Sequence, residues 1–281
     1  MIPILFQIGP VKVYSYGLMI ALGFLAADVV LRREFARHGY GVELASRLLL
    51  WSLVAGLVGS RLYDIADNLP VYLADPKLMI FSGSGFVFYG GLIGGILASV
   101  VFARLYKIPW LRLADMAAPA LLLGHAIGRL GCQLSGDGDW GLPSTLPWAM
   151  AYPNAIVGWN AQTVLTLDRS GHLVSGYFPG VRVHPTPVYE SILYAIGFYV
   201  LWALRRRLVK DGQIFYLYLV LAGAARFVVE FVRINPRVMF GLTEAQIISA
   251  MMVAVGSVGL LAIYSTASKV AISERSAAVG S

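Results

Sequence analysis

The chain has 281 residues, of which 58% are hydrophobic and only 13% are charged, and its mean hydropathy is +0.72. Soluble domains carry about 25% charged residues, so this composition excludes a soluble protein and indicates an integral membrane protein. The net charge of +7 would suggest a nucleic-acid partner in a soluble protein, but here the basic residues lie in short loops between apolar stretches, where they set membrane topology and predict no nucleic-acid binding.

Seven apolar stretches, each about 17 to 22 residues long, predict seven membrane-spanning helices. They are expected at approximately 14–31, 45–63, 86–103, 113–131, 186–204, 213–232 and 244–264. The fold class is therefore an all-α polytopic membrane protein, and residues 1–281 are expected to form a single integral membrane domain. The single cysteine excludes an internal disulfide and offers no metal-site spacing, so neither a metal nor a cofactor is expected.

Basic residues cluster in the loops that follow the first, third and fifth spans and after the seventh. Because cytoplasmic loops are enriched in Lys and Arg, this pattern predicts a periplasmic N-terminus and a cytoplasmic C-terminus. The segment 132–183, between the fourth and fifth spans, then lies on the periplasmic side and is longer than a helix connection requires. It is expected to be a functional loop or a small cap, and the chemistry is expected to face the periplasm.

The third span opens with the sequence YGGLIGG, which contains two overlapping pairs of small residues four positions apart. Gly90 with Gly94, and Gly91 with Gly95, predict a close approach to another helix. This pattern is common in membrane helices, so by itself it does not identify a function. The neighbouring Tyr89 fits an interfacial aromatic belt.

The end of the fourth span, GHAIGRLGCQLSGDGDWG, is the most informative stretch of the chain. On a helix, His125, Arg129 and Cys132 fall at positions i, i+4 and i+7 and share one face. A charged group near hydrocarbon is costly, so Arg129 requires an anionic or strongly accepting partner. This face could hold a phosphate, or it could be a packed helix end from which the arginine reaches the interface.

The fifth and sixth spans also carry charged residues. Glu190 enters the apolar layer near the start of the fifth span and requires a cation or a hydrogen-bond partner. Arg226, Glu230 and Arg233 are spaced so that they could form a self-contained salt-bridged face. Alternatively, an excess of guanidinium groups from Arg61, Arg129 and Arg226 would attract a phosphate, and a lipid headgroup is the nearest phosphate in a membrane.

The chain resembles the prolipoprotein diacylglyceryl transferase family in six stretches that follow one another: FQIGPVKVYSYGLMIALGF, GSRLYDIADNLPVYLADP, YGGLIGG, GRLGCQLSGDGDWG, HPTPVYE and GAARFVVEFVR. The resemblance implies a seven-helix enzyme of the bacterial inner membrane. Such an enzyme moves diacylglycerol from phosphatidylglycerol to the thiol of the lipobox cysteine in a prolipoprotein signal peptide, forming a thioether and releasing glycerol phosphate. This is an early step of lipoprotein maturation.

The resemblance also implies a set of site residues. The expected catalytic residues are Tyr89, His125, Arg129, Asp137, Arg226 and Glu230. The expected substrate-binding residues are Tyr16, Arg61, Gly90, Gly91, Arg129, Gly141 and Arg233. In the expected mechanism, an incoming thiolate displaces the phosphate from the glycerol carbon while Arg129 and Arg226 neutralise the charge on the departing group.

The chain departs from the family pattern at several site positions. Tyr89 stands where the family commonly has a histidine proposed as a base, and His125 is the better titrating candidate by its intrinsic pKa. Cys132 replaces a common asparagine, and one extra residue precedes Trp140, so the family acid corresponds to Asp137 or Asp139. These departures leave open a relative with an altered substrate, or one that only binds lipid.

Two further alternatives concern the type of activity. Half-buried arginines and glycine-rich helices also line the substrate paths of transporters and anion channels, although the paired repeats common in transporters are not evident. Cys132 could be a covalent nucleophile activated by His125. An i, i+7 separation spans about 10 Å on a straight helix, which argues against direct contact between these two side chains.

Overall fold

The computed structural model describes residues 1–9, 11–74, 87–156, 165–167, 173–175 and 182–279. The chain divides into two compact units, which are residues 1–27 with 117–281 (the first unit) and residues 28–116 (the second unit). Both boundaries fall inside helices, namely α1 (Ser15–Arg37) and α6 (Trp110–Ser135).

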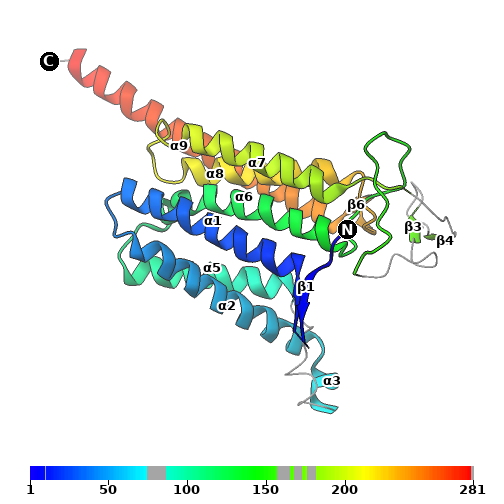
Figure 1. The fold of residues 1–281 in the computed structure, drawn as a ribbon. Helices are drawn as coiled ribbons and strands as arrows, with labels where there is room; N and C mark the ends of the chain where they lie inside the picture. Colours follow the sequence, from blue (N-terminus) through cyan, green and yellow to red (C-terminus); the bar gives the residue numbers. More distant parts are fainter. Residues whose placement is uncertain (10, 75–86, 157–164, 168–172, 176–181, 280–281) are drawn as a thin grey trace. The chain divides into compact units, whose positions relative to one another are not determined.

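Six of the described helices are long and apolar enough to cross a membrane (Figure 1). They are α1, α2 (Glu43–Asp67), α5 (Phe88–Leu105), α7 (Thr186–Leu204), α8 (Gln213–Glu230) and the part of α9 (Glu244–Val279) that runs from Glu244 to Ser265. These helices confirm the helical fold class. The expected fourth span falls within α6, whose 26 residues exceed the roughly 20 that a span requires. Along its length α6 carries Arg112, Asp115 and Arg129.

Three antiparallel hairpins accompany the helices in the described part of the chain. They pair β1 (Ile4–Ile8) with β2 (Val11–Tyr14), β3 (Leu165–Leu167) with β4 (Leu173–Ser175), and β5 (Arg237–Met239) with β6 (Leu242–Thr243). A short helix, α3 (Leu69–Ala74), follows α2. The hairpin β3–β4 lies within the expected cap, but residues 157–164, 168–172 and 176–181 of that cap lie outside the described residues.

The turn between β5 and β6 shows how local sequence sets this structure. Phe240 and Gly241 both have positive φ, at 51° and 71°. Two successive residues of this kind are typical of the tight hairpin turns whose twist matches that of the flanking strands. The hairpin connects the segment after α8 to the start of α9 at Glu244.

The core of the first unit joins α6, α7 and α8. Ala118, Leu122 and Ala126 lie four residues apart on α6 and are buried with Tyr194 of α7. The Ser191 hydroxyl of α7 donates a 2.8 Å hydrogen bond to the backbone carbonyl of Ala126. This bond fixes the start of α7 beside the last turns of α6, where the sequence analysis placed the chemistry.

In the second unit, α2 and α5 cross with little more than backbone between them. A methyl group on Gly59 would collide with the backbone of Gly90, and one on Gly94 would collide with the carbonyl of Ala55. A methyl group on Gly95 would meet nothing within 4 Å. The close helix approach predicted from the glycine pattern is therefore confirmed for Gly90 and Gly94, whereas Gly95 does not contribute to it.

Gly94→Ala should destabilise the protein by about 1 to 3 kcal/mol relative to Gly95→Ala, because the added methyl group overpacks the crossing of α2 and α5. Both changes replace glycine by the better helix former in the same helix, so Gly95→Ala controls for helix propensity. The midpoint of thermal unfolding in detergent measures the difference. Equal midpoints for the two variants would contradict the close packing at Gly94.

Candidate functional site

Three arginines of the first unit converge on one buried carboxylate. Glu190, in the first turns of α7, has a side chain that is 0% exposed. Its Oε2 lies 2.5 Å from Nε of Arg129. Its Oε1 pairs with Nη1 of Arg226 and lies 3.3 Å from Nη1 of Arg233. The expectation that Glu190 requires a cationic partner is confirmed.

A second buried carboxylate, Glu230, holds the end of α8 in place. Its Oε2 lies 3.0 Å from Nη2 of Arg226 and 3.6 Å from Nε of Arg233. Its Oε1 accepts hydrogen bonds from Nδ2 of Asn235 at 2.6 Å and from the Thr243 hydroxyl at 2.9 Å. The predicted ion pairs along this face exist, but the face is not self-contained, because both arginines also reach Glu190.

A third carboxylate, Asp139, comes from the loop after α6. Its Oδ1 lies 2.5 Å from Nη2 of Arg233, and its Oδ2 accepts a hydrogen bond from Nη1 of Arg129. The Asp139 side chain is 30% exposed. Burial alone would raise the pKa of this carboxyl, but the guanidinium groups of Arg233 and Arg129 hold the pKa below its usual range. Asp139 is therefore ionised at neutral pH.

Backbone contacts explain why this loop meets the arginines. Gly141 donates a 2.9 Å hydrogen bond to the carbonyl of His184 and forms an antiparallel bridge with Arg233. A side chain at Gly141 would collide with the carbonyl of Val232 and with Thr186. Gly141 thus allows the loop to pack against the start of α7 and the segment after α8.

The three arginines and three carboxylates give this cluster a formal charge of zero. The sequence analysis expected an excess of guanidinium groups from Arg61, Arg129 and Arg226. Arg61 lies in the second unit, and the arginines of this cluster are matched by its carboxylates. Buried ion pairs are held by strong mutual attraction, and removal of one partner leaves an uncompensated charge. A phosphate at this position would compete with the carboxylates for the guanidinium groups.

Asp137 and Cys132 lie beside this cluster. Asp137 accepts a hydrogen bond from the backbone N–H of Asp139 at 3.2 Å, and Nη1 of Arg129 lies 3.9 Å from the Cys132 sulfur. The Cys132 sulfur and an oxygen of each aspartate lie within 4.8 Å of one another, which a metal ion could bridge. Both oxygens of Asp139 already pair with arginines, however, and the positive charge of the arginines disfavours a cation.

His125 and Tyr16 border the cluster. His125 lies one turn before Arg129 on α6, and its ring stacks on Tyr194 with centroids 5.2 Å apart. Tyr16, near the start of α1, packs against the end of α6, because a methyl group on Gly131 would come within 3.3 Å of its ring. Tyr16 is therefore positioned at the level where α6 ends.

The structure places the expected site residues in two groups. The first unit contains Tyr16, His125, Arg129, Asp137, Gly141, Arg226, Glu230 and Arg233. The second unit contains Arg61, Tyr89, Gly90 and Gly91. The sequence analysis left Asp139 undecided and omitted Glu190 from the expected set. The available signal for Glu190 was a carboxylate in the first turns of an apolar helix.

Within the second unit, Arg61 contacts Asp64 of α2 and Tyr72 of α3. Its Nη1 lies 3.9 Å from Oδ2 of Asp64, and its guanidinium carbon lies 5.7 Å from the centre of the Tyr72 ring. The Tyr72 hydroxyl donates a hydrogen bond to Asp64. Gly90 and Gly91 pack against α2, and the ring of Tyr89 contacts that of Phe88 with centroids 5.9 Å apart.

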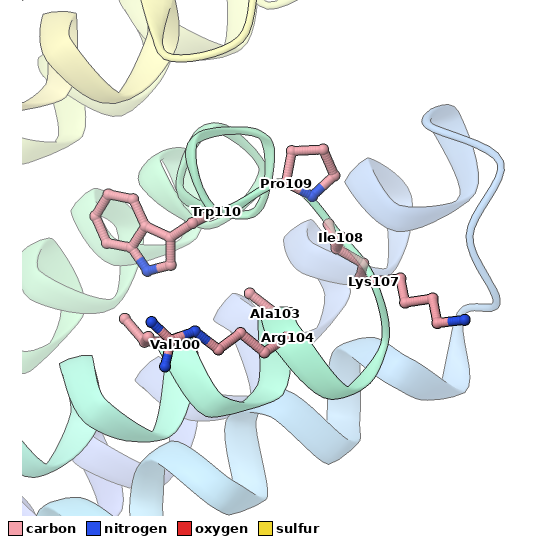
Figure 2. A pocket seen from close by; sticks show the side chains of 7 residues that line it. All are labelled: Val100, Ala103, Arg104, Lys107, Ile108, Pro109 and Trp110. Atoms are coloured by element: carbon pink, nitrogen blue, oxygen red, sulfur yellow. The ribbon is translucent and has the colours of Figure 1, made fainter.

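The second unit also contains a cavity between the end of α5 and the start of α6. Its volume is about 560 Å³. Figure 2 shows Arg104 extending toward Trp110, while Lys107 points away from it. The remaining lining residues, Val100, Ala103, Ile108 and Pro109, carry no acid, base or nucleophile, so this cavity does not offer the chemistry of the arginine cluster.

Comparison with known proteins gives one consistent result. The family model described as "Prolipoprotein diacylglyceryl transferase" matches residues 3–262. Similar proteins with the name phosphatidylglycerol–prolipoprotein diacylglyceryl transferase include those of Clostridium tetani and Geobacter sulfurreducens. The first is 30% identical over 257 residues, covering 90% of this chain and 94% of the relative. The second is 34% identical over 247 residues, covering 85% of each chain.

Glu190→Gln should destabilise the protein by about 3 to 5 kcal/mol, because three largely buried guanidinium groups lose their shared counter-charge. Glu43→Gln is the matched control, since Glu43 is exposed at the start of α2 and its neutralisation should change stability by less than about 0.5 kcal/mol. Thermal unfolding in detergent measures both. Equal stability of the two variants would show that Glu190 does not hold the cluster together.

Proposed function

This chain belongs to the prolipoprotein diacylglyceryl transferase family, and we propose that it transfers the diacylglyceryl group of phosphatidylglycerol to a prolipoprotein. The acceptor is the thiol of the lipobox cysteine in the signal peptide. The products are a thioether-linked lipoprotein precursor and glycerol phosphate. The observation that carries this proposal is the convergence of Arg129, Arg226 and Arg233 where apolar helices end.

The protein is a multi-pass protein of the inner membrane, and we place its N-terminus in the periplasm and its C-terminus in the cytoplasm. The distribution of basic loops supports this orientation. In it, α6 and α8 both end at the periplasmic side and α7 begins there. Arg129, Glu190 and Arg226 come from these three helix ends, so the cluster faces the periplasm, where the prolipoprotein thiol arrives.

The reaction exchanges a carbon–oxygen bond for a carbon–sulfur bond. The thiol loses its proton to a base, and the resulting thiolate attacks the glycerol carbon that carries the phosphate. The carbon–oxygen bond breaks and its electron pair moves to the phosphate oxygen, so negative charge develops on the departing glycerol phosphate. Guanidinium groups held in advance at that position lower the barrier by stabilising this charge.

The carboxylates of the cluster keep the arginines in place before lipid arrives. Glu190 and Glu230 are fully buried and together contact Arg129, Arg226 and Arg233. Fixed donors stabilise developing charge more effectively than mobile ones, because no reorganisation is needed during the reaction. We therefore assign Arg129 and Arg226 to the charge that develops on the departing phosphate, Arg129 and Arg233 to binding of the lipid phosphate, and the two glutamates to positioning.

Purified protein incubated with phosphatidylglycerol and a lipobox peptide should give a thioether-linked diacylglyceryl peptide, detected by mass spectrometry. Arg129→Ala and Arg226→Ala should each reduce the rate about 100- to 1,000-fold, which is typical for the loss of one electrostatic donor. Arg207→Ala, at an exposed position after α7, is the control and should react normally. Normal rates in either site variant would refute its assigned role. Lipid flux in liposomes without any product would favour a transporter.

Tyr89→His restores the residue that the family commonly has before its glycine run, and it should retain or increase the rate if Tyr89 occupies the position of the base. Imidazole accepts a proton near neutral pH, whereas phenol does not. Phe88→His, one residue earlier in α5, controls for the mere presence of histidine and should give no increase. Complete loss of activity in Tyr89→His would mean that the site depends on the phenol.

A further inference from the structure

We infer that the Asp139 carboxylate is an internal anion that occupies the place of the lipid phosphate until phosphatidylglycerol arrives. This inference rests on the proposed function and extends it to a specific exchange. In the absence of lipid, Asp139 neutralises Arg129 and Arg233. On binding, the phosphodiester of the lipid takes over these two guanidinium groups and the Asp139 side chain moves away.

The charge of the cluster favours such an exchange. Arg129, Arg226 and Arg233 face the carboxylates of Asp139, Glu190 and Glu230. A neutral cluster gives an anion little net attraction, and a fourth negative charge would be repelled by the three already present. Release of one carboxylate restores a single positive charge, which matches the single negative charge of a phosphodiester.

Asp139 is the carboxylate that can leave. Glu190 and Glu230 have side chains that are 0% exposed and are fixed on helices, and Glu230 is also held by Asn235 and Thr243. Asp139 lies on a loop, and 30% of its side chain is exposed. Removal of a buried glutamate from its partners would leave an uncompensated charge in the core, whereas a displaced Asp139 can be solvated.

The geometry of Asp139 is that of a bridging anion. Its two oxygens contact different arginines, Oδ1 on Arg233 and Oδ2 on Arg129. A phosphodiester presents two unesterified oxygens that can bridge two guanidinium groups in the same way. The ligand class recognised at this position is therefore an anion with two oxygens on one centre, and the lipid phosphate fits it.

The backbone at this position is anchored, so the exchange involves the side chain only. The Thr186 hydroxyl donates a hydrogen bond to the carbonyl of Asp139, and the Asp139 N–H donates to Asp137. Two residues later, Gly141 is bonded to His184. Rotation of the Asp139 side chain toward solvent frees the guanidinium groups of Arg129 and Arg233 for a phosphate without unfolding the loop.

The test measures equilibrium binding of phosphatidylglycerol with a fluorescent acyl chain to the detergent-solubilised full chain, without peptide. Asp139→Asn should bind about tenfold more tightly than the unchanged protein, because a competing charge-assisted pair is removed. Asp28→Asn is the matched control, since it breaks another aspartate–arginine pair, at 2.6 Å to Arg32, and its affinity should stay within about twofold. If Asp139 has only a structural role, its replacement should weaken the binding of phosphatidylglycerol.

Unchanged or weaker binding in Asp139→Asn would overturn the exchange, provided that its unfolding midpoint shows a folded protein. If this variant does not fold, Asp139→Ser takes its place with the same expectation. The outcome is separate from that of the proposed reaction. Tighter binding by Asp139→Asn, with no thioether product from the protein without substitutions, would support the exchange and refute the reaction. Product formation by the protein without substitutions, with no tighter binding by Asp139→Asn, would support the reaction and refute the exchange.

Discussion

The site depends on a single buried carboxylate shared by three arginines. Glu190 has no exposed surface and pairs with guanidinium groups that come from the end of α6, the end of α8 and the segment after α8. Without it, three like charges would repel one another in a medium of low dielectric constant. The packing of α6, α7 and α8 and the Ser191 hydrogen bond to Ala126 place Glu190 where it can act.

The loop after α6 is one place where this chain departs from the family pattern. The extra residue before Trp140 leaves two aspartates in the loop after α6, and the structure directs Asp139 rather than Asp137 to the arginines. The resemblance left the family acid open between Asp137 and Asp139, with Asp137 as the expected catalytic residue, and the ion pairs favour Asp139. Cys132 lies near Arg129 but takes no part in the proposed transfer, which uses the thiol of the substrate.

Sequence reasoning predicted the helical class, the positions of the spans and the close helix approach at Gly90, because these features follow from apolar length and residue size. It also predicted that Arg129 and Glu190 require partners, since burial of an unpaired charge costs free energy whichever residues surround it. It could not predict which charges pair across helices. The ion pairs of Asp139 depend on backbone bridges between residues about 90 positions apart, and no local pattern encodes them.

The most direct test of this account is an experimental structure of the protein with phosphatidylglycerol bound. The account predicts the lipid phosphate within hydrogen-bond distance of Arg129 and Arg233, Glu190 still paired with the arginines, and the Asp139 carboxylate displaced from both. A headgroup bound elsewhere while Asp139 retains both arginine contacts would contradict it.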